Sequence, residues 1–455
     1  MYERIPTNIR EMVHPFAVAT NNAYFTENKW IIEDLFEKSL LAKHGRYPIF
    51  DIQFEILSHI IETDSNRRKY LGWKDRFAKA IESLKKNGAP LERMTIAQER
   101  LEFMTNSVEA TRLFLSRLRS IGDGIAWWFM NYDRATLRLL AEHDYIQAPQ
   151  LGAGLYAELW QCANLAAQGK PFLLNSITNF LRFGDITVYD KATDSFELIE
   201  VKASQSQTRR TMRQGKQLAM VQQGLETGAH SFPDVTITKV MCKSPLLTYI
   251  KSLERVLEEA KHELASSRVF GEYLSFSAFH TKKIIELPEQ DRYRVMDNII
   301  KRCMSVFKYR NDLPLPVMSN ILPTVSFSRM LAPYTIFPIS SELRFALMTG
   351  EFFTLSWLNI SGLARWLEKR GWKIKIASLR DMIPNADTSQ YIPVLKVKKG
   401  RKETEIGLDI LALAASEFWM PESLERIITT TLNEATRSGS FFAVNFPNFG
   451  KYAWD

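Results

Sequence analysis

Asp185, Glu200 and Lys202 are the only ionisable residues of this chain whose types and spacing suggest a catalytic centre. They lie in two apolar segments, 183–189 and 196–202, separated by a short polar stretch of turn-like composition. Alternation at period two predicts that both segments are strands, and it rests on the β-branched residues Ile186, Val188, Ile199 and Val201. The chemistry of the three ionisable residues therefore depends on a pair of adjacent strands.

Side-chain alternation along the second strand would place Glu200 and Lys202 on one face and Val201 on the other. If the two strands pair as a hairpin, Asp185 can lie beside Glu200. Two carboxylates held close together repel each other and favour a cation between them, and hard oxygen ligands suit Mg²⁺ or Mn²⁺. A lysine at the edge of such a site can orient an attacking water, help to deprotonate it, or offset charge on a phosphate.

The Glu-x-Lys spacing carries no information by itself, because the chain contains a second copy at Glu259 and Lys261. That copy lies in 251–264, a segment rich in Glu, Lys, Leu and Ala that predicts a solvated helix. Residues two apart on a helix do not face each other. The first copy differs from the second by its strand context and by the segments that flank it.

A basic segment follows the second strand, between residues 204 and 228, with no acidic residue before Glu226. Its polar residues of interest are Arg209, Arg210, Arg213, Lys216 and Gln217. On a helix, the spacing of four puts Arg209, Arg213 and Gln217 on one face. Such a helix is suited to gripping a phosphate backbone, and a solvated basic face is the alternative interpretation.

This arrangement resembles the PD-(D/E)xK, or restriction endonuclease-like, nuclease superfamily, in which a helix precedes the Asp strand and the (Asp/Glu)-x-Lys strand. Over residues 150 to 242, Glu158 matches the acid of the first helix and Gln217 the glutamine of the helix that follows. Segment 234–240 matches the closing strand, and Gly184 replaces the proline of the signature.

The resemblance implies metal-dependent hydrolysis of phosphodiester bonds, with Mg²⁺ or Mn²⁺ held by Asp185, Glu200 and the main-chain carbonyl of Val201. Lys202 would position the water and stabilise the pentavalent phosphorus. Glu158 would bind a second metal or support the first, or it is a helix-surface acid. Gln217 would orient Lys202 or contact DNA, or it is a solvated residue. Arg209, Arg210, Arg213 and Lys216 are the candidate contacts to nucleic acid.

Composition limits the other function classes. The 455 residues are 45% apolar, enough for two or three packed domains, and the net charge of +8 is compatible with nucleic acid. The three cysteines are isolated, which argues against a zinc site or a disulfide framework and favours a reducing, cytoplasmic compartment. A signal peptide and a membrane-spanning segment are not expected. The sequence contains no P-loop, Gly-x-Ser-x-Gly or Gly-x-Gly-x-x-Gly motif, and its seven histidines are scattered.

The predicted organisation is α/β in the core and α+β overall, in three domains. Residues 1–145 form a helical N-terminal domain, 146–245 the nuclease core with a central mixed sheet, and 246–455 an α+β domain that binds nucleic acid or a partner. In the first domain, apolar spacing predicts helices, with a break at 120–124 before the last; their ranges are 31–42, 52–62, 73–86, 96–120 and 125–142. A tryptophan pair at Trp127 and Trp128 is expected to be core rather than a base-stacking platform.

In the third domain, the charged segment 244–268 predicts a helix that serves as a spacer or an oligomerising element. Residues 332–339 suggest strand or loop, and 359–370 an amphipathic helix ended by Gly371. A strand at 372–376 and a hairpin over 391–406 with a lysine-rich turn would follow. Helix and hairpin together are compatible with a winged-helix-like DNA reader, and equally with any α+β domain.

Two functions from different classes remain. The first is a Mg²⁺-dependent deoxyribonuclease, acting alone, as a homodimer or with a partner, in bacterial restriction or anti-phage defence. RNA is a second possible substrate, because its phosphodiester suits the same metal chemistry. The second function is a catalytically silent DNA-binding or assembly subunit that keeps the nuclease-like fold.

Overall fold

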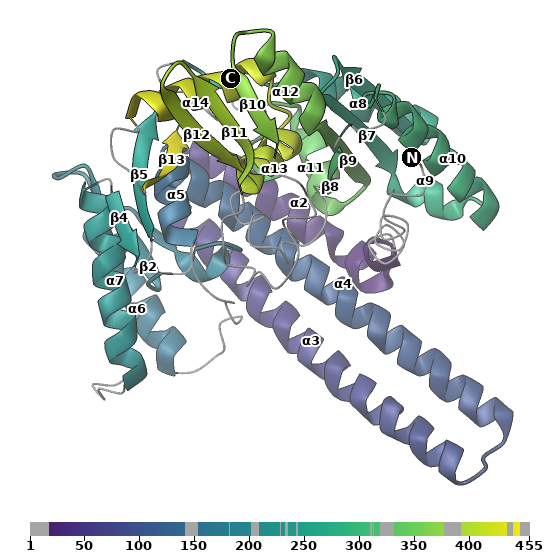
Figure 1. Cartoon of the computed structure of the whole chain (residues 1–455). Helices are drawn as coiled ribbons and strands as arrows, with labels where there is room; N and C mark the ends of the chain where they lie inside the picture. The colour runs from purple at the N-terminus through teal and green to yellow at the C-terminus, as the bar shows by residue number, and fades with distance from the viewer. Residues whose placement is uncertain are drawn as a thin grey trace.

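The structure is a computed structural model that describes residues 18–141, 153–181, 183–201, 209–227, 229–232, 235–242, 244–309, 312, 314–318, 332–376, 393–434 and 440–445. Helices and strands alternate along most of the chain, which confirms the α+β class (Figure 1). Of the helices described, none has the length and apolar character needed to cross a membrane.

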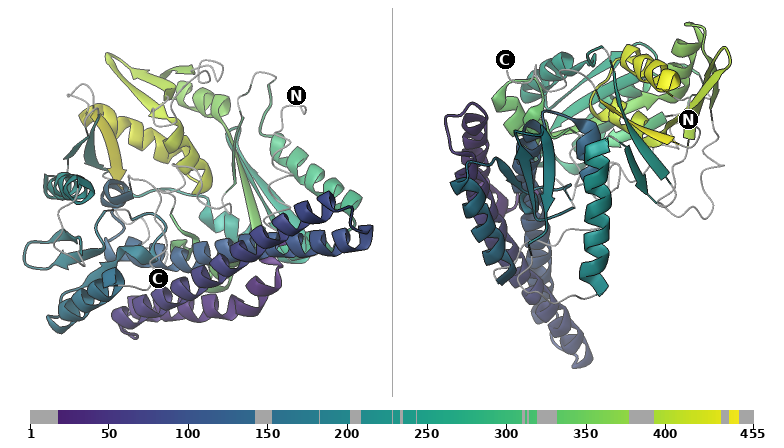
Figure 2. Two further views of the ribbon diagram at one scale, coloured as in Figure 1. Left: turned by 90° about the horizontal axis from the view of Figure 1, so that it is seen from below. Right: turned by 90° about the vertical axis from the view of Figure 1, so that its left-hand side faces the viewer.

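The N-terminal part is helical, as predicted. Its helices are α2 (Ala23–Lys43), α3 (Ile49–Lys86), α4 (Leu91–Phe129) and α5 (Arg134–Ala141). The two helices expected at 52–62 and 73–86 are one continuous helix, α3. Helices α3 and α4 form a long hairpin whose far end projects beyond the rest of the molecule (Figures 1 and 2).

The predicted break at 120–124 is wrong, because α4 continues through Gly122 and Gly124. A Cβ atom on Gly122 would lie 2.1 Å from the carbonyl oxygen of Ile177, and one on Gly124 would lie 2.4 Å from Oγ1 of Thr335. Both glycines therefore allow close packing against α4 and do not interrupt it. Their neighbours lie in two short 3₁₀ helices, η2 (Asn175–Ile177) and η4 (Tyr334–Ile336).

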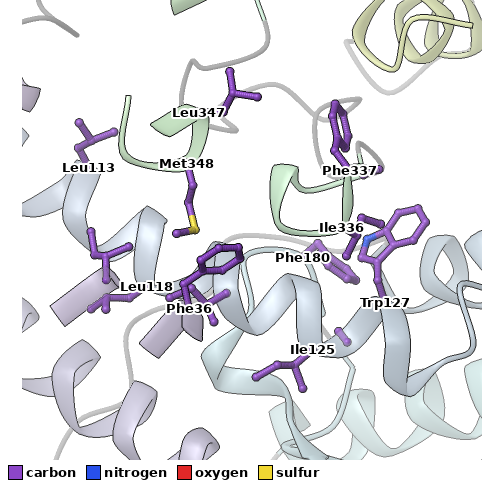
Figure 3. Packing of buried hydrophobic residues seen from close by; sticks show 14 of the residues in the cluster. Phe36, Leu113, Leu118, Ile125, Trp127, Phe180, Ile336, Phe337, Leu347 and Met348 are labelled. Carbon is purple, nitrogen blue, oxygen red and sulfur yellow. The ribbon is translucent and has the colours of Figure 1, made fainter. Parts of the chain in front are cut away.

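The core around α4 draws on segments that are far apart in the sequence. Figure 3 shows Phe36, Leu118 and Trp127 from the helices together with Phe180 and Ile336. The expectation that the tryptophan pair is core is confirmed: the side chain of Trp127 is fully buried, and Trp128 packs against the same cluster. Segment 332–339, expected as strand or loop, contributes η4 to this core.

The middle of the chain follows the predicted order of elements. These are α6 (Ala153–Ala167), β1 (Phe172–Leu174), β2 (Ile186–Asp190), β3 (Ser195–Ile199), α7 (Arg209–Thr227), β4 (Ala229–Phe232) and β5 (Val235–Met241). Strands β1, β2 and β3 form an antiparallel sheet in that order. The expected hairpin is confirmed, with Ile186 opposite Ile199 and Val188 opposite Glu197.

The described strands of this region fall into two sheets, whereas a single central mixed sheet was expected. Strand β5 pairs antiparallel with β4 and parallel with β13 (Ser440–Asn445), about 200 residues later in the sequence. The free edge of β3 is occupied by a side chain of α7: Gln222 accepts from Leu198 N at 3.1 Å and donates to Phe196 O at 2.9 Å. A further strand would need those same backbone groups.

A four-stranded antiparallel sheet of order β6-β7-β9-β8 follows. Its strands and helices are α8 (Ile250–Glu263), β6 (Ala265–Phe270), β7 (Leu274–His280), α9 (Thr281–Glu286), α10 (Glu289–Met304), β8 (Pro314–Met318), α11 (Ser341–Thr349) and β9 (Phe352–Asn359). Helix α8 falls within the charged segment expected to be helical, and strand β6 ends that segment. Leu253 and Leu257 of α8 are buried, and the helix packs on β6 and β7. Its apolar face thus belongs to the core, contrary to the spacer interpretation.

The last part of the chain contains the predicted helix, strand and hairpin. They are α12 (Ile360–Glu368), β10 (Lys373–Ile376), β11 (Pro393–Lys399) and β12 (Lys402–Gly407), followed by α13 (Leu408–Ser416) and α14 (Pro421–Glu434). Gly371, just after α12, has a φ of +84°, and Gly400 in the hairpin turn has a φ of +63°. Both glycines occupy the left-handed region that other residues rarely adopt.

Two apolar clusters hold the described residues together. The larger joins the N-terminal helices to β1–β3 and to the sheet β6–β9, so it extends across positions 145 and 245. The smaller lies between α12, the hairpin and helices α13 and α14. The domain boundaries at 145 and 245 stay predictions, and the packing on either side of both is continuous.

Candidate metal centre

Asp185 lies immediately before β2, beside the end of β3. Glu200 and Val201 follow β3, so the strand expected over 196–202 ends at Ile199 and does not include them. Gly184, which precedes Asp185, has a φ of +68°, and a Cβ there would lie 3.0 Å from the carbonyl oxygen of Ile199. Asp185 N donates to Ile199 O at 2.8 Å, and Val201 N donates to Asp185 Oδ2 at 2.7 Å. The carboxylate is therefore fixed against the backbone that carries Glu200.

Asn175 braces the turn that presents Asp185. Its Nδ2 donates to Phe183 O at 2.8 Å and to Gly184 O at 3.2 Å, and its Oδ1 accepts from Thr187 Oγ1 at 2.8 Å. Its main-chain N–H donates to Asp185 O at 3.0 Å. This buried amide was missed from the sequence, because a single asparagine at the start of a short 3₁₀ helix gives no periodic or motif signal.

Both edges of the sheet that carries Asp185 are paired with glutamine side chains. Gln222 of α7 satisfies the β3 edge, and Gln53 of α3 does the same for β1. Gln53 Nε2 donates to Phe172 O at 3.0 Å and its Oε1 accepts from Leu174 N at 2.7 Å. Each primary amide mimics one peptide unit of a neighbouring strand. Neither glutamine is distinguishable in the sequence from the chain's other glutamines.

Glu158, Asp185 and Glu200 lie close enough to influence one another electrostatically. The pKa of Glu158 is raised to about 7, first because the half-buried carboxyl loses solvation and then because Asp185 and Glu200 carry negative charge nearby. Burial also raises the pKa of Asp185, although the N–H of Val201 favours its charged form and partly offsets this. A proton on Glu158, or a cation beside it, would relieve the repulsion that this carboxyl experiences from Asp185 and Glu200.

Cys162 lies one turn after Glu158 on α6 and is buried. Burial, and then the charge of Glu158, raise the pKa of its thiol to about 12. The thiol is therefore protonated at neutral pH and is not suited to be a nucleophile or a metal ligand. The carboxylates, and not Cys162, are therefore the groups here that could bind a metal or transfer a proton.

The donor set fits a hard divalent cation such as Mg²⁺ or Mn²⁺, since it consists of carboxylate oxygens in a partly desolvated place. These carboxylates do not surround a common point as the ligands of a bound ion would. Across the described ranges, no three His, Cys, Asp or Glu side chains stand close enough together to hold a metal ion. Asp185, Glu200 and Glu158 thus form an electrostatically coupled group whose spacing is wider than that of bound ligands.

The remaining predicted residues are placed only in part. Lys202 lies outside the described residues. Val201 is described, and its N–H is used by Asp185. Lys216 is exposed on α7. Four further predicted residues lie on the backbone of α7, with side chains outside the described part of the structure: Arg209, Arg210, Arg213 and Gln217.

Comparison of the chain with protein-family models, with curated proteins and with solved structures finds no match. The resemblance to the PD-(D/E)xK superfamily therefore rests on the residues named above and on their arrangement.

Proposed function

We propose that this chain is a metal-dependent nuclease that hydrolyses phosphodiester bonds of DNA. The observation that carries the proposal is the pair of hydrogen bonds that fixes Asp185 against the backbone on either side of Glu200, with Glu158 near enough for both carboxylates to raise its pKa. Helix α6, the hairpin and the basic segment of α7 follow one another in the order expected of a PD-(D/E)xK core. Hairpin pairing holds Asp185 and Glu200 at the adjoining ends of β2 and β3, which is a rigid support, and Glu158 is carried by α6.

In the proposed mechanism, Asp185, Glu200 and the carbonyl of Val201 would hold Mg²⁺ or Mn²⁺. The bound ion would lower the pKa of a water molecule and offset charge on the phosphate. Lys202 orients the attacking water. Glu158, whose half-buried carboxyl lies near Asp185 and Glu200, would take up the proton that the water loses.

The proposed substrate is DNA because α7 begins with a run of basic residues just after the Glu-x-Lys segment. Lysine and arginine at that place would neutralise phosphates next to the reacting bond. RNA is tested alongside DNA, since the reacting group is the same. A role in restriction or anti-phage defence is the biological setting that we propose for such an enzyme.

The test is cleavage of supercoiled, linear and single-stranded DNA, and of RNA, in Mg²⁺ or Mn²⁺. Asp185→Asn is the sharpest variant, because an amide oxygen can still accept from Val201 N while the charge is lost. We expect at least roughly 100-fold slower cleavage for Asp185→Asn and for Lys202→Ala. Lys261→Ala, from the Glu-x-Lys copy on α8, is the matched control and should cut like the wild type.

A wild type that leaves every one of these substrates intact in both metals would contradict the proposal. So would an Asp185→Asn variant that cuts as fast as the wild type. If Lys261→Ala lost as much cleavage as Asp185→Asn, the loss would reflect a general change in charge and would not identify the candidate site.

One observation favours a second candidate, a nuclease-like subunit that binds DNA without cutting it. The three carboxylates are coupled, yet no group of three among the described side chains is tight enough to be a metal cage. Isothermal titration with Mn²⁺ distinguishes the two functions. Mn²⁺ binding that is lost in Asp185→Asn supports the enzyme, and DNA binding without Mn²⁺ binding or cleavage supports the silent subunit.

A further inference from the structure

The far half of the α3–α4 hairpin, residues 65–105, is a projecting arm with no role in the proposed active site. Figures 1 and 2 show its two helices extending past the sheets and the other helices. No residue of the arm belongs to either of the two apolar clusters. Its helices pack on each other, so their outward faces are surfaces open to a partner.

The α3 side of the arm is strongly basic. Residues 67–86 contain eight lysines and arginines and two acids, a net charge of +6. Helical spacing gathers five of the basic residues on the outward face, away from α4: Arg68, Lys69, Arg76, Lys79 and Lys86. All five are exposed. The two acids of this stretch, Asp75 and Glu82, are exposed as well and lie four residues before Lys79 and Lys86, at the edge of the same face, so five bases and two acids give this face a net charge of +3.

Most of these charges are not neutralised within the protein. Arg68 pairs with Asp64, but Lys69, Arg76, Lys79 and Lys86 make no ion pair with any described residue. A row of solvated lysines on a helix is common, and by itself it would not indicate a binding surface. Here the charges lie along one face for about 20 residues, or roughly 30 Å of helix.

An exposed aromatic residue lies at the edge of the basic face. Trp73 is 48% exposed and stacks on Phe77, with ring centroids 6.3 Å apart and planes 28° from parallel. The guanidinium of Arg76 lies over the Trp73 ring at 4.9 Å. The ring holds Arg76 without neutralising it, so less side-chain entropy is lost when the guanidinium meets an anion.

Charge complementarity identifies the partner. A second copy of the arm would offer residues 91–105 of α4, whose two basic and three acidic residues give a net charge of only −1. Duplex DNA offers about one negative charge per 1.7 Å of axis, so roughly 30 Å of it far exceeds the +6 of the helix. We propose that the outward face of α3 binds the phosphate backbone of duplex DNA along about one helical turn. The choice of DNA among polyanions rests on the proposed function.

The test measures binding of a fluorescent 30-base-pair duplex by anisotropy, in EDTA, where the proposed cleavage cannot occur. The arm variant is Lys69→Ala/Arg76→Ala/Lys79→Ala. The matched control, Arg294→Ala/Lys301→Ala/Arg302→Ala, removes three exposed charges from α10. We expect at least roughly tenfold weaker binding for the arm variant, with a slope of log affinity against log salt shallower by about 2 to 3, and little change for the control.

Equal binding by the arm variant and the wild type would overturn the proposal, as would an equal loss in both triple variants. A change in sedimentation of the arm variant, without loss of DNA binding, would assign the face to contact between copies instead. Thermal melts of both triple variants test whether either variant is misfolded. A chain that binds through the arm but never cuts supports this inference and contradicts the proposed nuclease, so the two can fail separately.

Discussion

Glu158 is the residue at which the electrostatics of the candidate site can be measured. Its carboxyl has an ordinary pKa of 4.5 when unfolded and a pKa of about 7 in the folded chain. Between those values the folded chain binds more protons at this residue than the unfolded chain does. The free energy of unfolding therefore falls as pH rises through this window, and the loss is complete above pH 7.

We predict that Glu158→Gln removes this part of the pH dependence. In EDTA at pH 8 the variant should be more stable than the wild type by roughly 1 kcal/mol, a figure reduced for the partial exposure of the side chain, and at pH 5 the two should be alike. Thermal denaturation followed by circular dichroism at both pH values measures this. Mg²⁺ at pH 8 should stabilise the wild type more than the variant, and identical pH profiles in EDTA would refute the electrostatic coupling.

At the scale of elements, α4 illustrates a sequence pattern with two structural meanings. A Gly-x-Gly pair predicts a break from propensity alone, since each glycine weakens a helix. In this chain the same pair lets η2 and η4 approach the helix axis, and the packing gained there outweighs the cost in propensity.

Two matched substitutions separate these meanings. Gly122→Ala would place a Cβ 2.1 Å from the carbonyl oxygen of Ile177, so we predict destabilisation by about 2 to 3 kcal/mol. Gly72→Ala lies in the exposed part of α3 with nothing within 4 Å of its Cβ, and it should stabilise by about 0.5 to 1 kcal/mol. Chemical denaturation measures both, and shifts of the same sign would contradict the packing role.

The elements that sequence predicts well are those whose signal is local. The β2–β3 hairpin, α12 with its Gly371 stop, and the β11–β12 hairpin all follow from alternation, amphipathic spacing and turn residues. The parallel pairing of β5 with β13 could not be predicted, because periodicity in one strand does not name a partner about 200 residues away. The same limit explains why Asp185, Glu200 and Lys202 could be proposed while the supporting Asn175 could not.

At the scale of the whole molecule, one buried ion pair connects the N-terminal helices to the C-terminal part. Arg134 of α5 donates to both carboxylate oxygens of Glu417, just after α13, at 2.8 and 2.6 Å. Glu417 also accepts from Ala332 N at 2.9 Å and from Trp419 Nε1 at 3.0 Å. The Arg134 guanidinium lies over the ring of Trp127 at 5.0 Å. Three separated segments thus meet at a single carboxylate.

This junction predicts that the parts of the chain unfold together. Arg134→Ala leaves a buried carboxylate without its cation, so we expect a loss of about 3 to 5 kcal/mol. The exposed pair of Lys261 with Glu342 is the control, and Lys261→Ala should leave the unfolding transition almost unchanged. Calorimetry of Arg134→Ala should show one transition at lower temperature. If only part of the transition moved while the rest stayed in place, the N-terminal helices and the C-terminal part would be independent folding units despite their shared core.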